Sequence, residues 1–226
     1  MPTQRRLCVF DCFGTVVFTA ERRPDHRELA ASFMDEFGCD EASAKRFVYL
    51  LIAHARLPTT PSLDVVAHVA GTAERLSLRP DRLMDFLWRC FGPVDGEWSV
   101  PAGARRTLDA LAAAGVELRM ITNCVLAPAQ MRRALDDLEI GRYFSKLMLS
   151  SEGQGKKPEE AWFAEALAGG FEDVVMVGDS EVFDIVPARS LGARTVRILG
   201  ADDWDEPPAA LTRDVMVEDP VMPPAT

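Results

Sequence analysis

The sequence has no excess of positive charge. Its 226 residues contain 25 Lys and Arg against 35 Asp and Glu, which gives a formal net charge of −10 and an isoelectric point of about 4.8. Proteins that bind a nucleic-acid backbone need a basic surface, so this balance argues against a nucleic-acid partner. Small molecules are the expected partners.

The sequence also lacks a long hydrophobic run. Its purely apolar stretches, such as residues 47–53, are much shorter than a membrane span. The N-terminal apolar segment meets Asp11 before the core of a signal peptide could form. We therefore expect no membrane association and a cytoplasmic location.

Paired cysteines are absent as well. The chain has five cysteines, an odd number, and none of them forms a Cys-x-x-Cys pair. This pattern indicates neither a disulfide framework nor a zinc site, and it favours reduced, buried thiols. The five residues are Cys8, Cys12, Cys39, Cys90 and Cys124.

What the sequence does contain is an alternation of strands and helices. Leu7 to Phe10 is a short, wholly apolar strand of the kind that is buried on both faces of a parallel sheet. After Pro93 strands and helices alternate, which predicts a parallel sheet with helices on both faces. Strands are expected at 116–121, 146–149, 173–177 and 194–198, and helices at 104–114, 128–138, 159–167 and 183–190.

Between the first strand and this alternating part, the pattern is helical throughout. Helices are expected at 26–37, 41–56, 63–76 and 81–91. The predicted fold class is α/β, a Rossmann-like parallel sheet core with an inserted all-helical subdomain. We expect residues 1–18 and 96–226 to form the core and residues 19–95 the insertion. The segment after Gly200 is rich in Pro and Asp and is expected to cover an edge or to be partly loose.

Polar residues follow four of the predicted strands. Ligands of such sheets bind at the carboxyl ends of the strands, so these residues are the candidates for a site. They are Asp11 to Thr15 after the first strand, Thr122 and Asn123 after the second, Ser150 to Pro158 after the third, and Gly178 to Asp184 after the fourth.

Together these side chains can hold an anion beside a metal ion. Asp11 could serve as a nucleophile and a metal ligand, and Asp179 and Asp184 could complete an oxygen-only magnesium site. Lys157 and Thr122 could bind the charged oxygens of a phosphoryl group. Each motif alone also fits an ordinary turn or a solvated side chain, and their order after successive strands is what favours a site.

The four motifs resemble those of the haloacid dehalogenase (HAD) superfamily over nearly the whole chain, with a helical cap inserted between the first and second. That family has a strand ending in Asp-x-Asp-x-Thr, a Ser or Thr after the second strand, a Lys commonly followed by Pro, and a Gly-Asp-x-x-x-x-Asp motif. The resemblance implies Asp11 as nucleophile, Thr122 as phosphate-binding hydroxyl and Lys157 as charge-stabilising ammonium. It also implies Asp179 and Asp184 as the acids that hold Mg²⁺.

The same resemblance extends to the neighbours of these residues. It implies that the backbone carbonyl of Phe13 is a further metal ligand, a role that does not depend on the side chain. Thr15 is placed with the catalytic residues, and Gly14 and Asn123 with those that bind the substrate.

Phe13 departs from the phosphatase pattern. In the family's phosphatases this position holds a second aspartate, which protonates the leaving oxygen and then activates water. General acid-base catalysis contributes roughly 10² to 10⁴ in rate, so its loss must narrow the chemistry or be compensated. Haloacid dehalogenases have an aromatic residue here, because displacing a halide needs no leaving-group proton.

Asp179 favours a phosphatase, whereas Phe13 favours a dehalogenase. The family's dehalogenases work without a metal and have an uncharged residue at this position. Three carboxylates without a cation would raise one another's pKa and weaken the nucleophile, so Asp179 argues for Mg²⁺. The leading hypothesis is a magnesium-dependent phosphohydrolase that acts on a small phosphorylated metabolite through an aspartyl-phosphate intermediate.

Two other functions stay open. One is a 2-haloacid dehalogenase-like hydrolase, and the other is a non-catalytic homologue that binds a phosphorylated ligand or a protein. Candidates for the missing acid are Glu21, Glu181 and a histidine of the cap, although the three histidines are expected to be packing or surface residues. Lys156 is expected to be solvated. Two tryptophans near the cap boundary, Trp88 and Trp98, are expected to pack and could touch the substrate.

Overall fold

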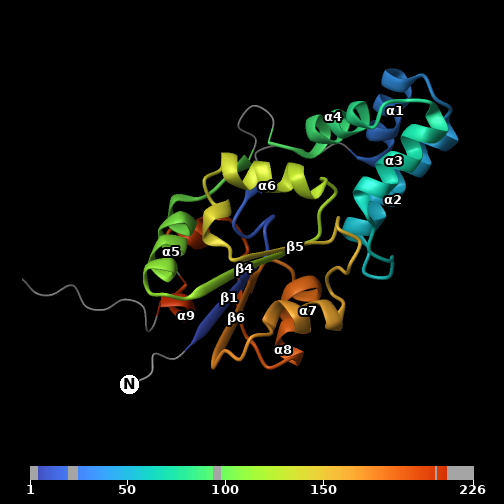
Figure 1. The fold of residues 1–226 in the computed structure, drawn as a ribbon. Helices are drawn as coiled ribbons and strands as arrows, with labels where there is room; N and C mark the ends of the chain where they lie inside the picture. Colours follow the sequence, from blue (N-terminus) through green and yellow to red (C-terminus); the bar gives the residue numbers. More distant parts are fainter. Residues whose placement is uncertain (1–4, 20–24, 94–97, 207, 213–226) are drawn as a thin grey trace, which may run out of the picture.

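The centre of the molecule is a five-stranded parallel sheet with the strand order β5-β4-β1-β6-β7 (Figure 1). We describe it from a computed structural model, in which residues 5–19, 25–93, 98–206 and 208–212 are described. The strands are β1 (Arg6–Phe10), β4 (Glu117–Thr122), β5 (Lys146–Leu149), β6 (Asp173–Gly178) and β7 (Arg194–Arg197). All neighbouring pairs in this sheet are parallel, which confirms the predicted fold class.

Helices cover both faces of the sheet (Figure 1). They are α5 (Ala102–Ala113) and α6 (Pro128–Asp137) on one face and α7 (Glu160–Leu167) and α8 (Val186–Ser190) on the other. Because side chains alternate along a strand, the central strand β1 serves both sides. Leu7 and Val9 belong to the apolar cluster of α7 and α8, whereas Cys8 and Phe10 belong to the cluster of α5 and α6.

Four helices lie between β2 (Phe18–Thr19) and β3 (Trp98–Ser99) in the part of the chain that the structure describes. They are α1 (His26–Phe37), α2 (Glu41–Arg56), α3 (Val65–Leu76) and α4 (Pro80–Phe91). The two short strands pair antiparallel, a feature that the sequence did not indicate. The third helix begins two residues later than expected, because the side chain of Asp64 caps its N-terminus by accepting from Ala67 N.

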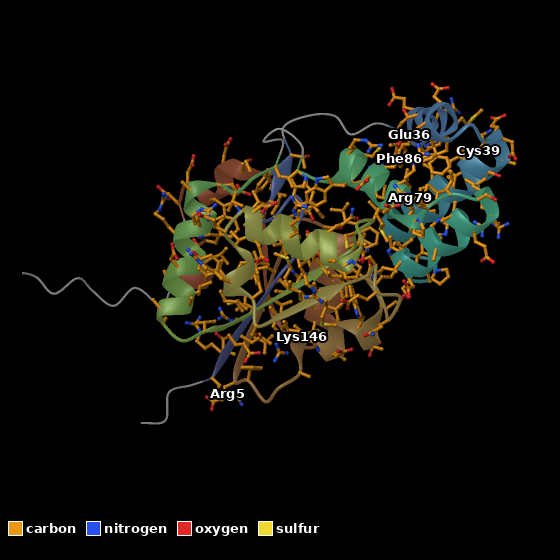
Figure 2. The ribbon with its side chains drawn as sticks, turned by 45° about the horizontal axis from the view of Figure 1, so that its top comes forward. Arg5, Glu36, Cys39, Arg79, Phe86 and Lys146 are labelled. Atoms are coloured by element: carbon orange, nitrogen blue, oxygen red, sulfur yellow. The ribbon has the colours of Figure 1, made fainter. Side chains whose placement is uncertain are left out.

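The helices of this insertion share an aromatic core beyond one end of the sheet. The ring of Phe33 lies 4.7 Å from that of Phe47 and 5.3 Å from that of Phe86. Figure 2 labels Glu36, Cys39, Arg79 and Phe86 in this part of the molecule. The division into a core of residues 1–18 and 96–226 and a cap of residues 19–95 stays a prediction, and parts of both junctions lie outside the described residues.

The segment after β7 packs onto the core. It forms a 3₁₀ turn, η3 (Ala201–Trp204), followed by α9 (Ala209–Thr212). The fully buried indole of Trp204 donates a hydrogen bond from Nε1 to the carbonyl of Thr15 at 2.7 Å. A Cβ at Gly103 would lie 1.5 Å from the Trp204 carbonyl oxygen, so glycine is required there. This part of the tail is therefore tied to the loop that follows β1.

The helix expected at 183–190 is divided. A π-helical turn, η2 (Glu181–Ile185), precedes α8, and Ser180 caps it by accepting a hydrogen bond from Phe183 N at 3.1 Å. Such wide turns are frequent at functional sites because they redirect side chains.

Two other expectations from the composition bear on the fold. All five cysteines are free thiols; three are buried, and Cys39 and Cys90 are partly exposed. None of the described helices combines the length and apolar character that a membrane crossing requires.

Candidate active site

The carboxyl end of β1 places Asp11 at the edge of the sheet. Its backbone N–H donates to the carbonyl of Val177 at 2.8 Å, which continues the pairing of β1 with β6 by one residue. The residue is only 4% exposed. Asp11 is therefore held by the ladder of the sheet, and a strand position fixes its carboxylate more firmly than a free loop would.

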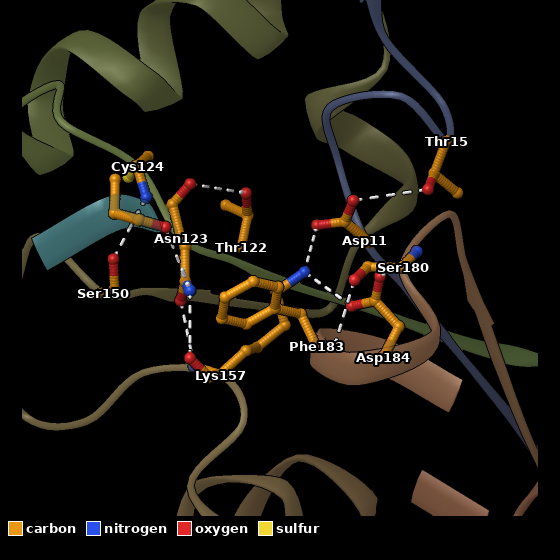
Figure 3. Close-up of polar contacts among 11 residues, drawn as sticks. Asp11, Thr15, Thr122, Asn123, Cys124, Ser150, Lys157, Ser180, Phe183 and Asp184 are labelled. Carbon is orange, nitrogen blue, oxygen red and sulfur yellow. Dashed lines mark hydrogen bonds and ion pairs between the residues drawn. The ribbon is translucent and has the colours of Figure 1, made fainter. Parts of the chain in front are cut away.

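The loop after Asp11 turns back toward the same carboxylate. Thr15 is buried and donates from its hydroxyl to Asp11 Oδ2 at 3.3 Å (Figure 3). Gly14 has a φ of +78°, and a Cβ there would lie 2.6 Å from Asp179 Oδ2. Glycine at this position thus permits both the left-handed turn and the close approach of Asp179.

Lys157 bridges two of the carboxylates. Its buried ammonium lies 2.5 Å from Asp11 Oδ1 and 2.6 Å from Asp184 Oδ1 (Figure 3). The side chain of Asn123 makes two hydrogen bonds with the backbone of Lys157. Its Oδ1 accepts from Lys157 N at 2.9 Å, and its Nδ2 donates to Lys157 O at 3.1 Å. The residue after β4 therefore positions the lysine after β5, a link that the sequence did not indicate.

Asp184 is fixed by the turn that follows β6. It is fully buried, and its Oδ2 accepts a hydrogen bond from Ser180 N at 3.0 Å. A Cβ on Gly178 would lie 2.4 Å from the Cβ of Asp184, so the glycine at the end of β6 makes room for it. Ser180 is a positioning element that sequence reasoning missed.

One oxygen from each of Asp11, Asp179 and Asp184 lies within 4.8 Å of the other two. Burial raises the pKa of Asp11 to about 7; Lys157 opposes this shift, and the charges of Asp184 and Asp179 add to it. Burial and the charge of Asp184 raise the pKa of Asp179. Carboxylate oxygens are the ligands that Mg²⁺ prefers, and a divalent cation would favour the ionised forms. The cluster therefore fits Mg²⁺.

The pKa of Lys157 is also set by burial and by neighbouring charges. Burial lowers its pKa, but the carboxylates of Asp11 and Asp184 raise it by more, so the net shift is upward. Lys157 therefore stays charged and neutralises part of the acidic cluster.

A cavity of about 380 Å³ opens onto these groups, a size suited to a small molecule. Its lining residues are Asp11, Phe13, Ala55, Arg56, Thr122, Asn123, Lys157, Asp179, Ser180, Phe183 and Asp184. The structure thus brings the predicted residues of all four motifs together. Among the described residues, the hydroxyl of the buried Thr122 has one long contact, 3.5 Å, to the carbonyl of Asn123.

The cavity includes residues that sequence reasoning missed. Ala55 and Arg56 come from the last turn of α2, and Phe183 comes from the π-helical turn. A basic residue in the last turn of a helix is commonplace, so Arg56 gave no signal in the sequence.

Phe13 lies half-buried at the cavity wall. Its ring packs edge-to-face on Trp98 with the centroids 4.9 Å apart. Trp98 is buried and does not line the cavity, so its contact with the site passes through Phe13. Phe13, backed by Trp98, thus stands at the position where the resemblance places a second aspartate in the family's phosphatases.

Two of the suggested replacements for the missing acid, Glu181 and His54, are not among the residues that line the cavity. Glu181 forms exposed ion pairs with Arg189 and Arg197. His54 is buried, and its Nε2 lies 3.2 Å from the Cys124 carbonyl and 2.9 Å from the Ser150 hydroxyl. Glu21 falls outside the described residues.

The expectation that Lys156 is solvated is wrong. The residue is fully buried. Its ammonium donates to the carbonyls of His54 and Leu57 and to the hydroxyl of Thr60, which satisfies its charge inside the protein. The three oxygens belong to the last turn of α2 and the loop after it, which pack against the loop that carries Lys156.

A parallel sheet with a buried aspartate, a lysine and two further acids at its strand ends is the architecture of an α/β hydrolytic enzyme. The family model described as haloacid dehalogenase-like hydrolase matches residues 5–192. The chain therefore belongs to the haloacid dehalogenase-like hydrolase family.

Known proteins of this family are distant relatives. A phosphoglycolate phosphatase of Agrobacterium fabrum is 26% identical over 94% of this chain and 88% of its own length. A HAD phosphatase of Thermococcus onnurineus has a TM-score of 0.53 at 19% identity, over 85% of each chain. A 2-haloacid dehalogenase of Pseudomonas syringae also has a TM-score of 0.53, at 22% identity over 85% of this chain and 86% of its own. The two structures support the fold alone.

Proposed function

We propose that this protein is a magnesium-dependent phosphohydrolase that acts on a small phosphorylated metabolite through an aspartyl-phosphate on Asp11. The observation that carries the proposal is the cluster of three carboxylate oxygens within 4.8 Å, with Lys157 bridging two of the acids. So compact a group of charges is stabilised by a cation. The phosphatase name of the Agrobacterium relative agrees with this reading.

The residues divide the work as follows. Asp11, Asp179, Asp184 and the carbonyl of Phe13 would hold Mg²⁺, which when bound supplies positive charge that polarises phosphoryl oxygens. The ammonium of Lys157, which lies between Asp11 and Asp184, would face the same phosphoryl oxygens.

The remaining predicted residues act around the nucleophile. Thr15 orients Asp11, and Thr122, with Gly14 and Asn123, provides donors for the phosphoryl oxygens. We further propose that residues 19–95 act as a cap, since the end of α2 forms one wall of the cavity.

The reaction has two steps. An oxygen of Asp11 attacks phosphorus, the bond from phosphorus to the ester oxygen breaks, and the leaving alkoxide takes a proton from solvent water. Water then attacks phosphorus, the bond to Asp11 breaks, and inorganic phosphate leaves with the carboxylate restored. Because Phe13 cannot accept the proton of that water, we expect the second step to be the slower one.

A 2-haloacid dehalogenase is the second candidate, and Phe13 is the observation that favours it. In that reaction Asp11 would displace halide from carbon, and water would hydrolyse the ester. No proton is needed by the leaving group, which suits an aromatic residue at this position. Asp179 is the observation against it, since it adds a third carboxylate to the site.

One screen separates these functions. Phosphorylated metabolites, including 2-phosphoglycolate, and 2-haloacids would each be incubated with the protein in Mg²⁺ and in excess chelator, and released phosphate and halide measured. We expect phosphate release that requires Mg²⁺. Halide release that persists in chelator would establish the dehalogenase instead, and no release from either class would favour a binding protein.

A further inference from the structure

The helical insertion is attached to the core through the segment between α2 and α3, in addition to the β2 and β3 pair. The segment between α2 and α3 runs along the loop that follows β5. Val65 N donates to Ser151 O at 3.0 Å, and the hydroxyl of Ser62 donates to Gly153 O at 3.0 Å. An isolated antiparallel bridge pairs Asp64 with Glu152. The segment that follows α2 is therefore held by the core.

Lys156 is at the centre of this attachment. Its ammonium donates to His54 O at 2.9 Å, to Leu57 O at 2.5 Å and to Thr60 Oγ1 at 2.9 Å, and the residue is 0% exposed. Carbonyls at a helix C-terminus lack partners within the helix and attract a cation. A buried ammonium is tolerated only when its three donors are used, and here all three are.

The turn that Lys156 holds presents Arg56 to the active-site cavity. The Arg56 side chain makes no hydrogen bond or ion pair with the residues that the structure describes. Arg56 also lines a smaller cavity of about 50 Å³. Phe13 lines that cavity too, but the three aspartates and Lys157 do not. Arg56 is an exposed residue that lines both cavities, on the side of the site where the remainder of a substrate would lie.

The charge balance of the site leaves Arg56 without a counter-ion. Three aspartates and Lys157 sum to −2, which a Mg²⁺ ion would cancel. Arg56 adds a positive charge that pairs with no carboxylate among the described residues, so it is available to an anionic group of the substrate. A guanidinium recognises a carboxylate or a phosphate with two parallel hydrogen bonds, so an anionic substrate group is its natural partner.

We propose that Lys156 is a positioning residue, which fixes the last turn of α2 so that Arg56 binds a second anionic group of the substrate. This inference rests on the phosphohydrolase function proposed above and narrows the substrate class. The preferred substrates are small phosphate monoesters that also bear a carboxylate or another anionic group. Lys157 acts on the phosphoryl group, whereas its neighbour Lys156 holds the end of α2, which forms another wall of the cavity.

Two probe substrates test this division of roles. The first, 2-phosphoglycolate, bears a carboxylate beside its phosphate, and the second, p-nitrophenyl phosphate, has no second anionic group. We expect Arg56→Ala and Lys156→Met each to raise KM for phosphoglycolate about tenfold, with kcat within about twofold and KM for the nitrophenyl ester unchanged. The double variant should be no worse than either single variant, because both changes remove the same contact.

Lys146→Met is the matched control. This lysine lies on β5 away from the cap helices (Figure 2), and its exposed ammonium pairs with Glu165. We expect no change in either KM. If Lys156→Met raised KM for both probes equally, or if its effect added to that of Arg56→Ala, Lys156 would be a general stabilising residue and the inference would be overturned.

Hydrogen exchange tests the attachment without relying on activity. In Lys156→Met we expect the amides of residues 54–60 to exchange about tenfold faster than in the parent, with no such change in Lys146→Met. Unchanged exchange would overturn the positioning role. Thr60→Val removes one of the three acceptors and gives a milder variant, with the same direction of change, should Lys156→Met fail to fold.

The two proposals fail in different ways. A parent protein that hydrolyses neither probe in Mg²⁺ contradicts the phosphohydrolase function. A parent protein that hydrolyses both probes, with a KM for phosphoglycolate that does not depend on Arg56, leaves the function standing and overturns the inference about the substrate.

Discussion

Lys156 and Lys157 are adjacent and both are buried, yet their ammonium groups face different kinds of partner. Lys157 lies between the carboxylates of Asp11 and Asp184, whereas Lys156 lies among neutral oxygens at the end of α2. Burial lowers the pKa of Lys156. At Lys157 burial acts in the same direction, but the two carboxylates outweigh it and the pKa rises.

The difference teaches that burial alone does not assign a role to a lysine. An ammonium between carboxylates takes part in the electrostatics of the site, so its loss changes the chemistry. An ammonium among carbonyl oxygens organises the backbone, so its loss changes where the neighbouring groups lie. The four predictions below test this contrast between the site around Lys157 and the attachment around Lys156.

The largest effect is expected at Asp11, the proposed nucleophile beside Lys157. Asp11→Asn replaces the attacking oxygen with an amide of the same shape, and we expect kcat to fall by at least about 10⁴-fold. The fold should be retained, because the backbone N–H of residue 11 still pairs with Val177. Steady-state kinetics and thermal unfolding measure the two effects. Residual activity above about 1% of the parent would mean that another group attacks phosphorus.

The next largest effect is expected at Lys157 itself. Lys157→Met removes the charge that bridges Asp11 and Asp184, and we expect kcat to fall by about 10² to 10³. The comparison with Lys156→Met is direct, since that variant should change KM and leave kcat nearly constant. Equal losses of kcat in the two variants would remove the distinction between the neighbouring lysines.

The attachment around Lys156 should make stability depend on pH through His54. Burial lowers the pKa of this histidine from 6.5 to about 4. Between these values the unfolded chain binds the proton and the folded protein does not, so stability falls as the pH drops from about 6.5 toward 4. This histidine should cost about 2 kcal/mol at pH 5 and nothing at pH 8.

The variant His54→Gln removes this titration. We expect its free energy of unfolding, measured in urea, to fall less between pH 8 and pH 5 than that of the parent. The measurement at pH 8 is the internal control, since there the histidine is neutral in both states and any difference reports lost contacts alone. An identical pH dependence in both proteins would show that His54 is not the group that titrates.

The smallest effect is expected at Phe13, which lines the active-site cavity. Phe13→Asp would restore a carboxylate that can activate water, and we expect turnover of phosphate esters to rise about tenfold and a burst of alcohol release in the parent to disappear. The gain is limited because the ring's packing on Trp98 is lost. Rapid-quench kinetics would measure the burst. Fast turnover in the parent without a burst would show that another group already moves the proton.

The sequence predicted most of the core because its signals are local. The apolar run Leu7 to Phe10 and the later alternation of strands and helices predict a parallel sheet, and the polar residues after each strand then have to meet at one edge. The proximity of Asp11, Asp179 and Asp184 follows from that argument, and the structure shows it. Their roles as nucleophile and metal ligands stay predictions.

What the tertiary structure decided are contacts between segments that no short pattern links. The ammonium of Lys156 reaches the carbonyl of His54 across 102 positions of sequence, and the indole of Trp204 reaches Thr15 across 189. Whether a lysine is solvated or buried depends on which helix end packs over it, and Arg56 enters the cavity only because α2 ends there. By itself, the sequence determined the order of elements and the residues at the strand ends, since both follow from periodicity and chain direction. Only the packing of α2 against the strand ends of the sheet decided which further side chains surround Asp11.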